Sequence, residues 1–110
     1  MTSAEEPGFK PVGPESLLPP PGRLSSVFLD KAEIVIANVD GRYYALDGLC
    51  DHAGYPLASG QLVGCELTCP LHGWIYDVTD GWVINPPFGH RTRSYKVRVT
   101  DGTVEVARAE

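Results

Sequence analysis

The chain has 110 residues and a formal net charge of −5, with 12 glycines, 10 prolines and 3 cysteines. This length suits one small domain and excludes a separate catalytic domain beside it. The glycine and proline content favours a loop-rich β domain, and the longest apolar run, IVIANV, is too short for a membrane span.

The first part of the chain contains few signals of regular structure. Residues 1–8 are small, acidic and rich in turn formers, which predicts a loose tail. The segment FKPV (9–12) is typical of a first short strand. Residues 17–24, LLPPPGRL, cannot form a helix, because three consecutive prolines lack N–H donors and fix φ. We expect a rigid surface connection there.

The rest of the chain alternates between strands and short turns. Asp-Gly pairs at 40–41, 80–81 and 101–102 stand between apolar runs, which is typical of β-hairpins. No window of eleven residues shows a convincing 3.6-residue period, so we expect no long helix. The strand-bearing segments are 24–29, 32–39, 39–47, 61–69 with a bend at Gly64, 74–84 and 94–107. They predict an all-β fold, a small antiparallel sandwich or barrel of about eight to ten short strands.

Negative charge is concentrated in the middle of the chain. Residues 43–90 contain no Lys or Arg, whereas acidic and basic residues balance in the rest. The acidic residues of this segment are Asp47, Asp51, Glu66, Asp77 and Asp80. This charge pattern argues against nucleic-acid binding, because phosphate contacts need Lys and Arg. Two interpretations remain open: docking to a basic protein surface, or an ordinary solvated acidic rim.

Two short segments each hold one cysteine and one histidine. They are CDHAGYPL, with Cys50 and His52, and CPLHGWIYD, with Cys69 and His72. Four such ligands suit one tetrahedral Zn²⁺ in a structural interaction module, but zinc fingers of this type pair Cys with Cys and His with His. The mixed pairs favour a [2Fe–2S] cluster with two Cys on one iron and two His on the other. Each loop would then contribute a ligand to both irons.

The spacing Cys-x-His, sixteen residues, Cys-x-x-His-Gly resembles the signature of Rieske proteins. The stretch CPLHGWIYD is especially similar to the second cluster loop of Rieske ferredoxins and Rieske oxygenases. The resemblance implies a Rieske-like fold, a single domain over 1–110 and a cluster-binding subdomain of about 48–90, formed around the two Cys/His loops. It also implies one Rieske-type [2Fe–2S] cluster, and the implied ligands are Cys50, His52, Cys69 and His72.

This ligand set has an electrostatic consequence. Two Fe(III) and two sulfides carry a charge of about +2, so two thiolates and two neutral imidazoles give a neutral oxidised centre, whereas four thiolates give about −2. An electron enters the neutral centre more easily, which accounts for the higher potentials of centres with two histidines. We expect the electron to reside on the iron bound by His52 and His72, and the potential to fall with pH in alkaline solution.

Residues around the ligands tune the potential within the family. The resemblance places Tyr55 and Leu71 where Rieske proteins of cytochrome complexes have a disulfide, and Trp74 where they have a serine. The loss of that stabilisation predicts a potential of roughly −150 mV to near zero. Tyr76 matches a tyrosine that donates a hydrogen bond to a ligand sulfur in that group, and the alternative is a core aromatic on a strand.

Other residues near the motif have two interpretations each. We expect Gly54 and Gly73 both to bring backbone N–H groups close to the cluster and to serve ordinary turns. The segment Pro86-Pro87-Phe88 resembles the third loop that covers the cluster in this family, or it is a plain connector. Cys65 is outside the ligand positions, and we expect a buried thiol on the same strand face as Cys69.

We expect Trp74 and Trp82 to be packing residues. Only His90 remains beyond the two ligand histidines, which excludes a mononuclear iron site of two histidines and a carboxylate in this chain. The start MTSAEEPGFK has no signal-peptide or anchor character, so we expect a soluble, cytoplasmic protein without a membrane partner.

The remaining interpretation is a one-electron carrier, similar to the ferredoxin component of multicomponent aromatic-ring oxygenase systems and not itself an enzyme. Such a carrier would receive an electron from an NAD(P)H-dependent ferredoxin reductase and deliver it to a terminal oxygenase, with transient docking at the acidic cluster end. The expected apolar centre of that contact comprises Pro56, Leu57, Leu71 and Pro87. Two alternatives remain open: the Rieske-type small subunit of an NAD(P)H nitrite reductase, and a structural zinc module.

Overall fold

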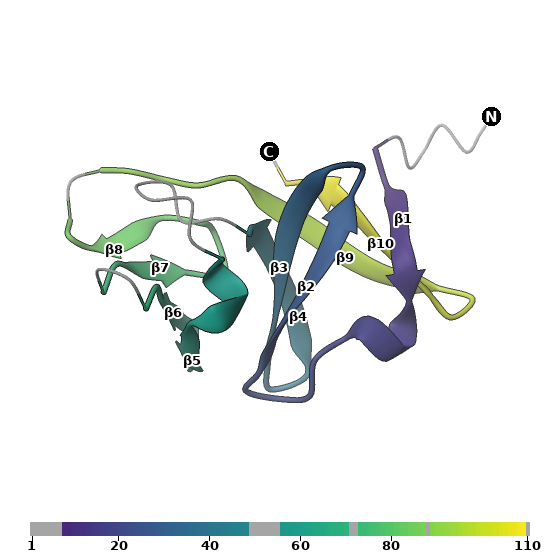
Figure 1. Cartoon of the computed structure of the whole chain (residues 1–110), viewed down its shortest axis with the longest axis horizontal. Coiled ribbons are helices and arrows are strands. Elements are labelled where there is room, and N and C mark those ends of the chain that lie inside the picture. The colour runs from purple at the N-terminus through teal and green to yellow at the C-terminus, as the bar shows by residue number, and fades with distance from the viewer. Residues whose placement is uncertain (1–7, 49–55, 71–72, 88, 110) are drawn as a thin grey trace.

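The computed structural model describes residues 8–48, 56–70, 73–87 and 89–109. These residues form ten strands in two antiparallel sheets, with two short 3₁₀ helices, η2 (Glu15–Leu17) and η3 (Leu57–Ser59) (Figure 1). The predicted all-β fold of eight to ten short strands is confirmed. No helix in this described part has the length and hydrophobicity needed to cross a membrane.

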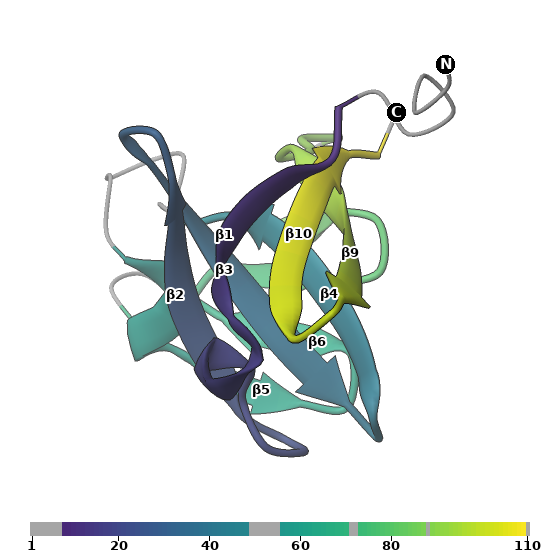
Figure 2. The same ribbon diagram turned by 90° about the vertical axis from the view of Figure 1, so that its right-hand side faces the viewer.

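The larger sheet has six strands in the order β1-β10-β9-β4-β3-β2. Their bounds are β1 Lys10–Pro14, β2 Leu24–Leu29, β3 Ala32–Val39, β4 Arg42–Asp47, β9 Ser94–Thr100 and β10 Thr103–Arg108. The sheet curls until its edge strands β1 and β2 are in contact, which gives a nearly closed barrel (Figure 2). Such closure protects the edges of a small β domain.

The smaller sheet has four strands in the order β5-β6-β7-β8. Their bounds are β5 Gln61–Val63, β6 Glu66–Thr68, β7 Ile75–Asp77 and β8 Val83–Asn85. The whole sheet belongs to one insertion between β4 and β9, two strands that are paired in the barrel through Ala45–Tyr95 and Leu46–Ser94. The insertion therefore leaves the barrel and returns to it at neighbouring points.

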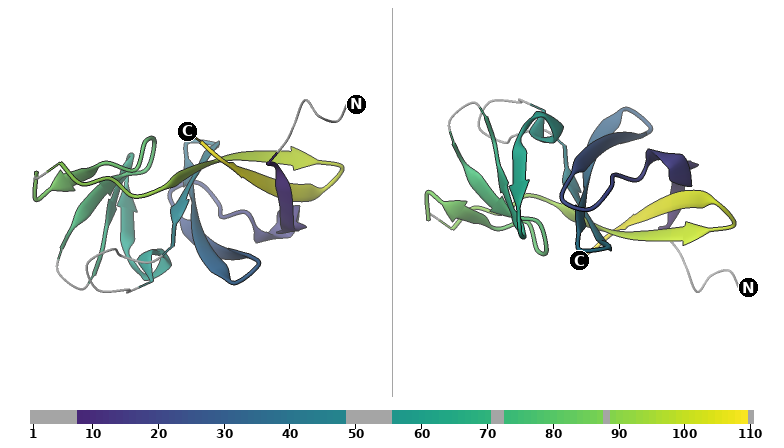
Figure 3. Two further views of the ribbon diagram at one scale, coloured as in Figure 1. Left: turned by 90° about the horizontal axis from the view of Figure 1, so that it is seen from above. Right: turned by 90° about the horizontal axis from the view of Figure 1, so that it is seen from below.

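Strand β3 is buried on both faces and separates two hydrophobic cores. Ile34 and Ile36 contribute to the barrel core, whereas Val35 and Ala37 contribute to the core between the barrel and the small sheet. The continuous apolar run of β3 is what such burial on both faces requires. Seen from above and below, the small sheet lies on one side of this wall and the rest of the barrel on the other (Figure 3).

The Asp-Gly hairpin turns are as predicted. At 40–41 and 101–102 both residues have positive φ, with 52° and 90° in the first pair and 51° and 79° in the second. Positive φ at both central positions is the geometry that matches the twist of paired strands, and Gly adopts it without a Cβ clash. These turns connect β3 to β4 and β9 to β10.

Some element boundaries differ from the sequence-based expectation. The first strand begins one residue later and extends to Pro14, and the segment 74–84 divides into β7 and the start of β8 around a turn at residues 78–81. The two 3₁₀ helices were not predicted, because three residues are too few to establish a helical period.

Candidate metal centre

Three loops meet at one end of the four-stranded sheet. Thr68 at the end of β6 pairs with Gln61 at the start of β5 and with Ile75 at the start of β7, and Ile75 pairs in turn with Asn85 at the end of β8. Three connections therefore emerge at the same end of the small sheet: the one that leads into β5, the one from β6 to β7, and the one that follows β8. We call this end the loop end of the small sheet.

The loop between β6 and β7 has a tightly held base. The Cys69 N–H donates to the Trp74 carbonyl at 2.7 Å, and the Gly73 N–H donates to the Cys69 carbonyl at 3.0 Å. Gly73 has a φ of 73°, a conformation that favours glycine. Cys69 itself is fully buried, although Pro70 and Gly73 beside it are exposed. The fold therefore places the predicted ligand Cys69 at the inner base of an exposed loop.

The segment that contains Cys50 and His52 also has a closed base. The chain leaves β4 at Gly48, whose carbonyl accepts a hydrogen bond of 2.7 Å from the Leu57 N–H. Gly48 is held against β3, since its own N–H donates to the Glu33 carbonyl at 2.8 Å, and a Cβ at this position would lie 2.9 Å from Glu33. The start and the return of this segment are therefore adjacent.

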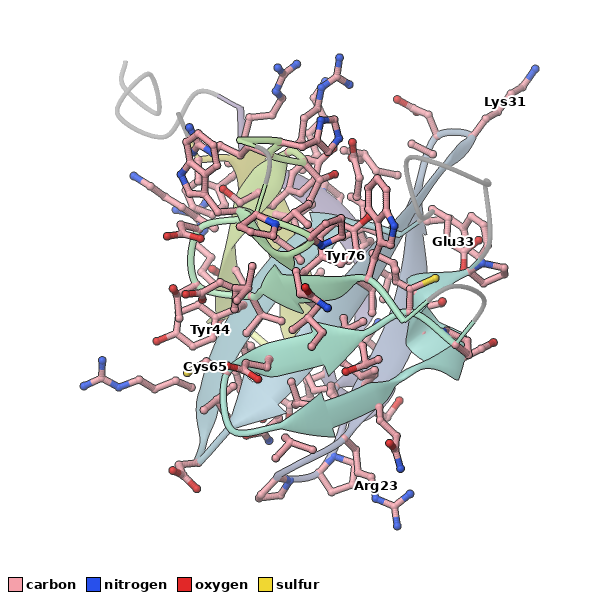
Figure 4. All side chains as sticks on the ribbon, turned by 90° about the vertical axis from the view of Figure 1, so that its left-hand side faces the viewer. Arg23, Lys31, Glu33, Tyr44, Cys65 and Tyr76 are labelled. Atoms are coloured by element: carbon pink, nitrogen blue, oxygen red, sulfur yellow. The ribbon has the colours of Figure 1, made fainter. Side chains whose placement is uncertain are left out.

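The bases of these two loops share one hydrophobic core. Leu57, Cys69 and Tyr76 are each 0% exposed and belong to the same buried cluster. Tyr76 lies at the centre of β7, and Figure 4 shows it within the small sheet. The core thus brings together the bases of two segments that are far enough apart in sequence to clamp a bound group from two sides.

The third connection, residues 86–89, returns beside the other two. Its base is closed by the Val83 N–H, which donates to the His90 carbonyl at 2.9 Å. The Trp74 ring lies edge-on to the His90 ring at a centroid distance of 6.2 Å, and 6.5 Å from the Tyr76 ring. Pro87 is exposed at this end. Its place beside the loop of Cys69 is compatible with the predicted covering role.

Of the predicted residues that the structure describes, Cys69, Gly73 and Pro87 lie at the loop end, and Tyr76, at the centre of β7, packs in the same core as Cys69. The Gly73 N–H is engaged by the Cys69 carbonyl, so the turn role predicted for this glycine is the one that the geometry displays. The other predicted site residues lie outside the described residues, as do the two positions of the missing disulfide: Cys50, His52, Gly54, His72, Tyr55 and Leu71.

Three expectations about neighbouring residues were wrong. Leu57 is fully buried in the core, so it cannot line a docking surface. Cys65 is exposed (Figure 4), because it lies in the turn at Gly64, before β6 begins, and not on the buried strand face that includes Cys69. Trp82 is 44% exposed, with the Arg91 guanidinium 5.8 Å from its ring centroid, whereas Trp74 packs against the core as expected.

The acidic residues of the insertion lie mostly away from the loop end. Glu66 begins β6 and pairs with Asp77 at the end of β7, and Asp80 lies in the following turn. These three carboxylates are therefore at the end of the small sheet opposite to Cys69. Of the acidic residues in the segment, Asp51 stays the candidate for the loop end, and it lies outside the described residues.

Sequence reasoning missed a buried polar pair beside the start of the first loop. The Tyr95 hydroxyl donates to Asp47 Oδ1 at 2.6 Å. Burial raises the pKa of Tyr95 to about 12, and the hydrogen bond and charge of Asp47 act in the same direction, against the lowering effect of Arg93 and Arg108. The two residues are 48 positions apart, so no local sequence pattern signals the contact.

The residues at the loop end fit an iron–sulfur cluster. A buried thiol at the base of a rigid loop is a soft donor shielded from water, as a cluster ligand must be. The base of the segment with Cys50 and His52 shares this core, and the sequence predicts two cysteine and two histidine ligands, three of which lie outside the described residues. This donor set suits the predicted cluster.

Comparison with known proteins agrees with this chemistry. A family model described as the Rieske [2Fe-2S] domain matches residues 8–96. The ferredoxin component of the naphthalene 1,2-dioxygenase system of Pseudomonas aeruginosa is 32% identical over 80 residues, which cover 73% of this chain and 77% of that protein.

Solved structures show the same architecture. The ferredoxin of carbazole 1,9a-dioxygenase from Nocardioides aromaticivorans IC177 is similar with a TM-score of 0.79 and 28% identity, over 93% of this chain and 99% of that one. A chain in the complex of reduced oxygenase and oxidized ferredoxin in carbazole 1,9a-dioxygenase is similar with a TM-score of 0.78 and 27% identity, over 93% and 94% of the two chains. With the family match spanning both Cys/His segments, the chain belongs to the family of Rieske [2Fe-2S] domains.

Proposed function

We propose that the chain is a one-electron carrier whose Rieske cluster is held by Cys50, His52, Cys69 and His72. When bound, the cluster supplies a reversible one-electron couple. The observation that carries this proposal is the burial of Cys69 at the base of a tight loop, in the same core as the base of the segment that contains Cys50 and His52.

The residues of the chain have two tasks in such a carrier. The hydrogen bonds at the loop bases, from Leu57 to Gly48 and from Cys69 to Trp74, fix the positions of the ligands. The core around Cys69 and Tyr76 excludes water from the thiolate side, while the loop end itself faces outward. A rigid, one-sided site of this kind favours electron exchange through the exposed loops.

The proposed route of the electron is from an NAD(P)H-dependent ferredoxin reductase to a terminal oxygenase that acts on an aromatic ring. Relatives that are named ferredoxin components of dioxygenase systems, and the ferredoxin–oxygenase complex of carbazole 1,9a-dioxygenase, support the oxygenase as the electron acceptor, and the reductase stays a prediction. The protein would act as a transport component and not as the catalyst. A cytoplasmic location stays a prediction.

The described surface of the loop end suits a contact with an uncharged centre. Among the described residues of the three loops, 56–61, 69–70, 73–74 and 84–90 without Phe88, none is Asp, Glu, Lys or Arg. Pro87 is exposed there and Pro56 is partly exposed. Such a surface supports short-lived docking through small apolar contacts, as electron-transfer partners use.

The ligand assignment is tested with the full-length protein and two cysteine variants. We expect the purified protein to be red-brown, to contain iron and acid-labile sulfide, and to have a reduction potential of roughly −150 mV to near zero. Cys69→Ser should lose most of the cluster, because a serine hydroxyl replaces the thiolate ligand. The matched control Cys65→Ser, on an exposed turn, should retain the wild-type iron content and visible spectrum.

Electron transfer is then measured by mixing the reduced protein with a terminal oxygenase of an aromatic-ring dioxygenase system. Oxidation of the carrier by the oxygenase, but not by the oxygenase depleted of its own iron, is the expected result. A colourless protein that binds zinc in place of iron would contradict the cluster assignment. A Cys69→Ser variant with full iron content would contradict the role of Cys69.

A further inference from the structure

The barrel contains a second candidate site, away from the loop end. A cavity of about 450 Å³ opens at one end of the six-stranded sheet. Its lining comes from residue 8 and the ends of β1, β2, β9 and β10 and from Arg93, with no contribution from the small sheet. Cavities of this volume lie in the range of small-molecule sites, and the mouth of a β-barrel is one of the places where such sites occur.

The cavity is at the mouth of the barrel because four strand ends meet there. Lys10 begins β1 and Leu29 ends β2, so both edges of the curled sheet contribute. Arg108 ends β10 and pairs directly with Tyr95 near the start of β9, which places these two side chains on one face. At the opposite end of the barrel, η2 packs against β2 and β10, and the adjoining Leu18 packs against the core.

The floor of the cavity is apolar. Tyr95 is 8% exposed, and Leu29 packs against the same barrel core as Tyr95. Ala107 is next to Arg108 in β10, so its side chain lies on the other face of the sheet. Gly8 lies at the wall, where an added Cβ would be 4.0 Å from the Ala107 Cβ. An aromatic ring and aliphatic groups at the bottom of a cavity favour a ligand with a compact apolar body.

The rim of the cavity is cationic. Lys10, Arg93 and Arg108 line it and are exposed. The charges of Arg93 and Arg108 both act on the Tyr95 hydroxyl, so these guanidinium groups lie close to the floor as well as to solvent. Among the described residues, Asp47 accepts the hydrogen bond from the Tyr95 hydroxyl. Three cations around one mouth stand out in a chain whose net charge is −5.

We propose that this mouth binds a small organic anion, with a carboxylate held by Lys10, Arg93 and Arg108 and a compact apolar body on Tyr95 and Leu29. Guanidinium groups pair with carboxylates through charge-assisted hydrogen bonds, and the apolar floor selects against inorganic anions. The site does not depend on the cluster or on the proposed function, because none of its described lining residues lies at the loop end.

The test titrates the full-length, cluster-containing protein with 1-naphthoate in a calorimeter. The neutral isostere 1-naphthamide and inorganic phosphate serve as the two ligand controls. Arg93→Gln and Arg108→Gln remove one rim charge each, and Arg42→Gln removes an exposed arginine at the other end of β4 as the matched control. The visible spectrum of each variant reports whether the fold is intact.

We expect 1-naphthoate to bind with one-to-one stoichiometry, at least tenfold more tightly than either control ligand, and more weakly as NaCl is added. Each rim variant should weaken binding about tenfold, while Arg42→Gln should change it less than twofold. Binding of 1-naphthamide or phosphate as tight as that of 1-naphthoate overturns the proposal, as does no binding. Unchanged affinity in both rim variants also overturns it. The comparison of ligands on the wild type decides the matter even if a variant fails to fold.

Discussion

Tyr76 is the residue in which core packing and redox tuning meet. Its side chain is fully buried in the hydrophobic cluster that contains Cys69, and the sequence resemblance predicts that it donates a hydrogen bond to a ligand sulfur. If its hydroxyl donates to a ligand sulfur, the bond stabilises the reduced state more than the oxidised state, because reduction adds negative charge to the sulfurs.

Tyr76→Phe should therefore lower the reduction potential. A hydrogen bond of about 1 kcal/mol corresponds to roughly 40 mV for a one-electron couple. The measurement is a spectroelectrochemical titration, with Tyr44→Phe as the control, because Tyr44 is partly buried against the same core but lies on β4. A potential that is equal in both variants would assign Tyr76 to packing alone.

Tyr95 predicts a loss of stability in alkaline solution. Folding raises its pKa from 10.0 to about 12, mainly because the phenol is buried. Between these pH values the folded chain keeps a proton that the unfolded chain loses, so the free energy of unfolding falls as the pH rises. The contribution is fully present below about pH 10 and is lost as the pH approaches 12.

Denaturant unfolding at a series of pH values measures this effect. In Tyr95→Phe the slope between pH 10 and 12 should become shallower, because the titrating phenol is absent. At neutral pH the same variant should lose about 1 kcal/mol, since Asp47 loses a hydrogen-bond donor. An unchanged alkaline slope would show that other groups control the loss.

At the scale of elements, the turn between β7 and β8 is held by a close backbone approach. Gly81 has a φ of 86°, and a Cβ there would lie 2.5 Å from the carbonyl oxygen of Thr92. Asp77 supports the same turn, since its side chain accepts hydrogen bonds from the Thr79 N–H and hydroxyl. The turn sets where β8 starts, and thus where the third loop emerges.

Gly81→Ala should therefore destabilise the protein strongly. The left-handed backbone costs about 1–2 kcal/mol for alanine, and the clash with the Thr92 carbonyl raises the total to about 3 kcal/mol or more. Gly64→Ala is the matched control, because its φ is also positive, at 62°, and nothing lies within 4 Å of its added Cβ. The midpoints of urea unfolding compare the two, and equal losses would mean that the clash is relieved.

Sequence patterns predicted the features that depend on neighbours along the chain. The Asp-Gly turns at 40–41 and 101–102 are set by local backbone geometry, so they were predicted correctly. Exposure of Leu57, Cys65 and Trp82 was not, because it depends on how the insertion packs against the barrel. The Asp47–Tyr95 pair joins the two strands that flank the insertion, and no periodicity signals it.

At the scale of the whole molecule, charge and docking surface are partly separated. The described residues of the loop end form an uncharged surface. Glu66, Asp77 and Asp80 lie at the far end of the small sheet, opposite to the loops. The three-residue strands separate the two ends by only about 10 Å, which is about one Debye length at 0.1 M salt. At this ionic strength, charges at the far end act more weakly on a contact at the loops than a charge at the loop end would.

At about 0.1 M salt, Asp51→Asn should therefore slow electron transfer to the oxygenase by a few-fold, whereas Glu66→Gln should slow it less. Asp51 lies between two proposed ligands in the sequence. The reduction potential and the iron content of the Asp51→Asn variant are therefore measured as well. Stopped-flow oxidation of the reduced carrier at several ionic strengths gives the rates. If Glu66→Gln slowed electron transfer more than Asp51→Asn, the docking surface would lie at the far end of the small sheet.

Burial of β3 on both faces has a consequence for how the protein unfolds and loses its iron. Val35 and Ala37 close the inner side of the metal-binding part, and Ile34 and Ile36 close the barrel. Neither half can melt alone without uncovering one side of this strand to water. Retention of iron on heating is thus tied to the cooperativity of the entire chain, and a substitution in the barrel, remote from any ligand, can bleach the protein.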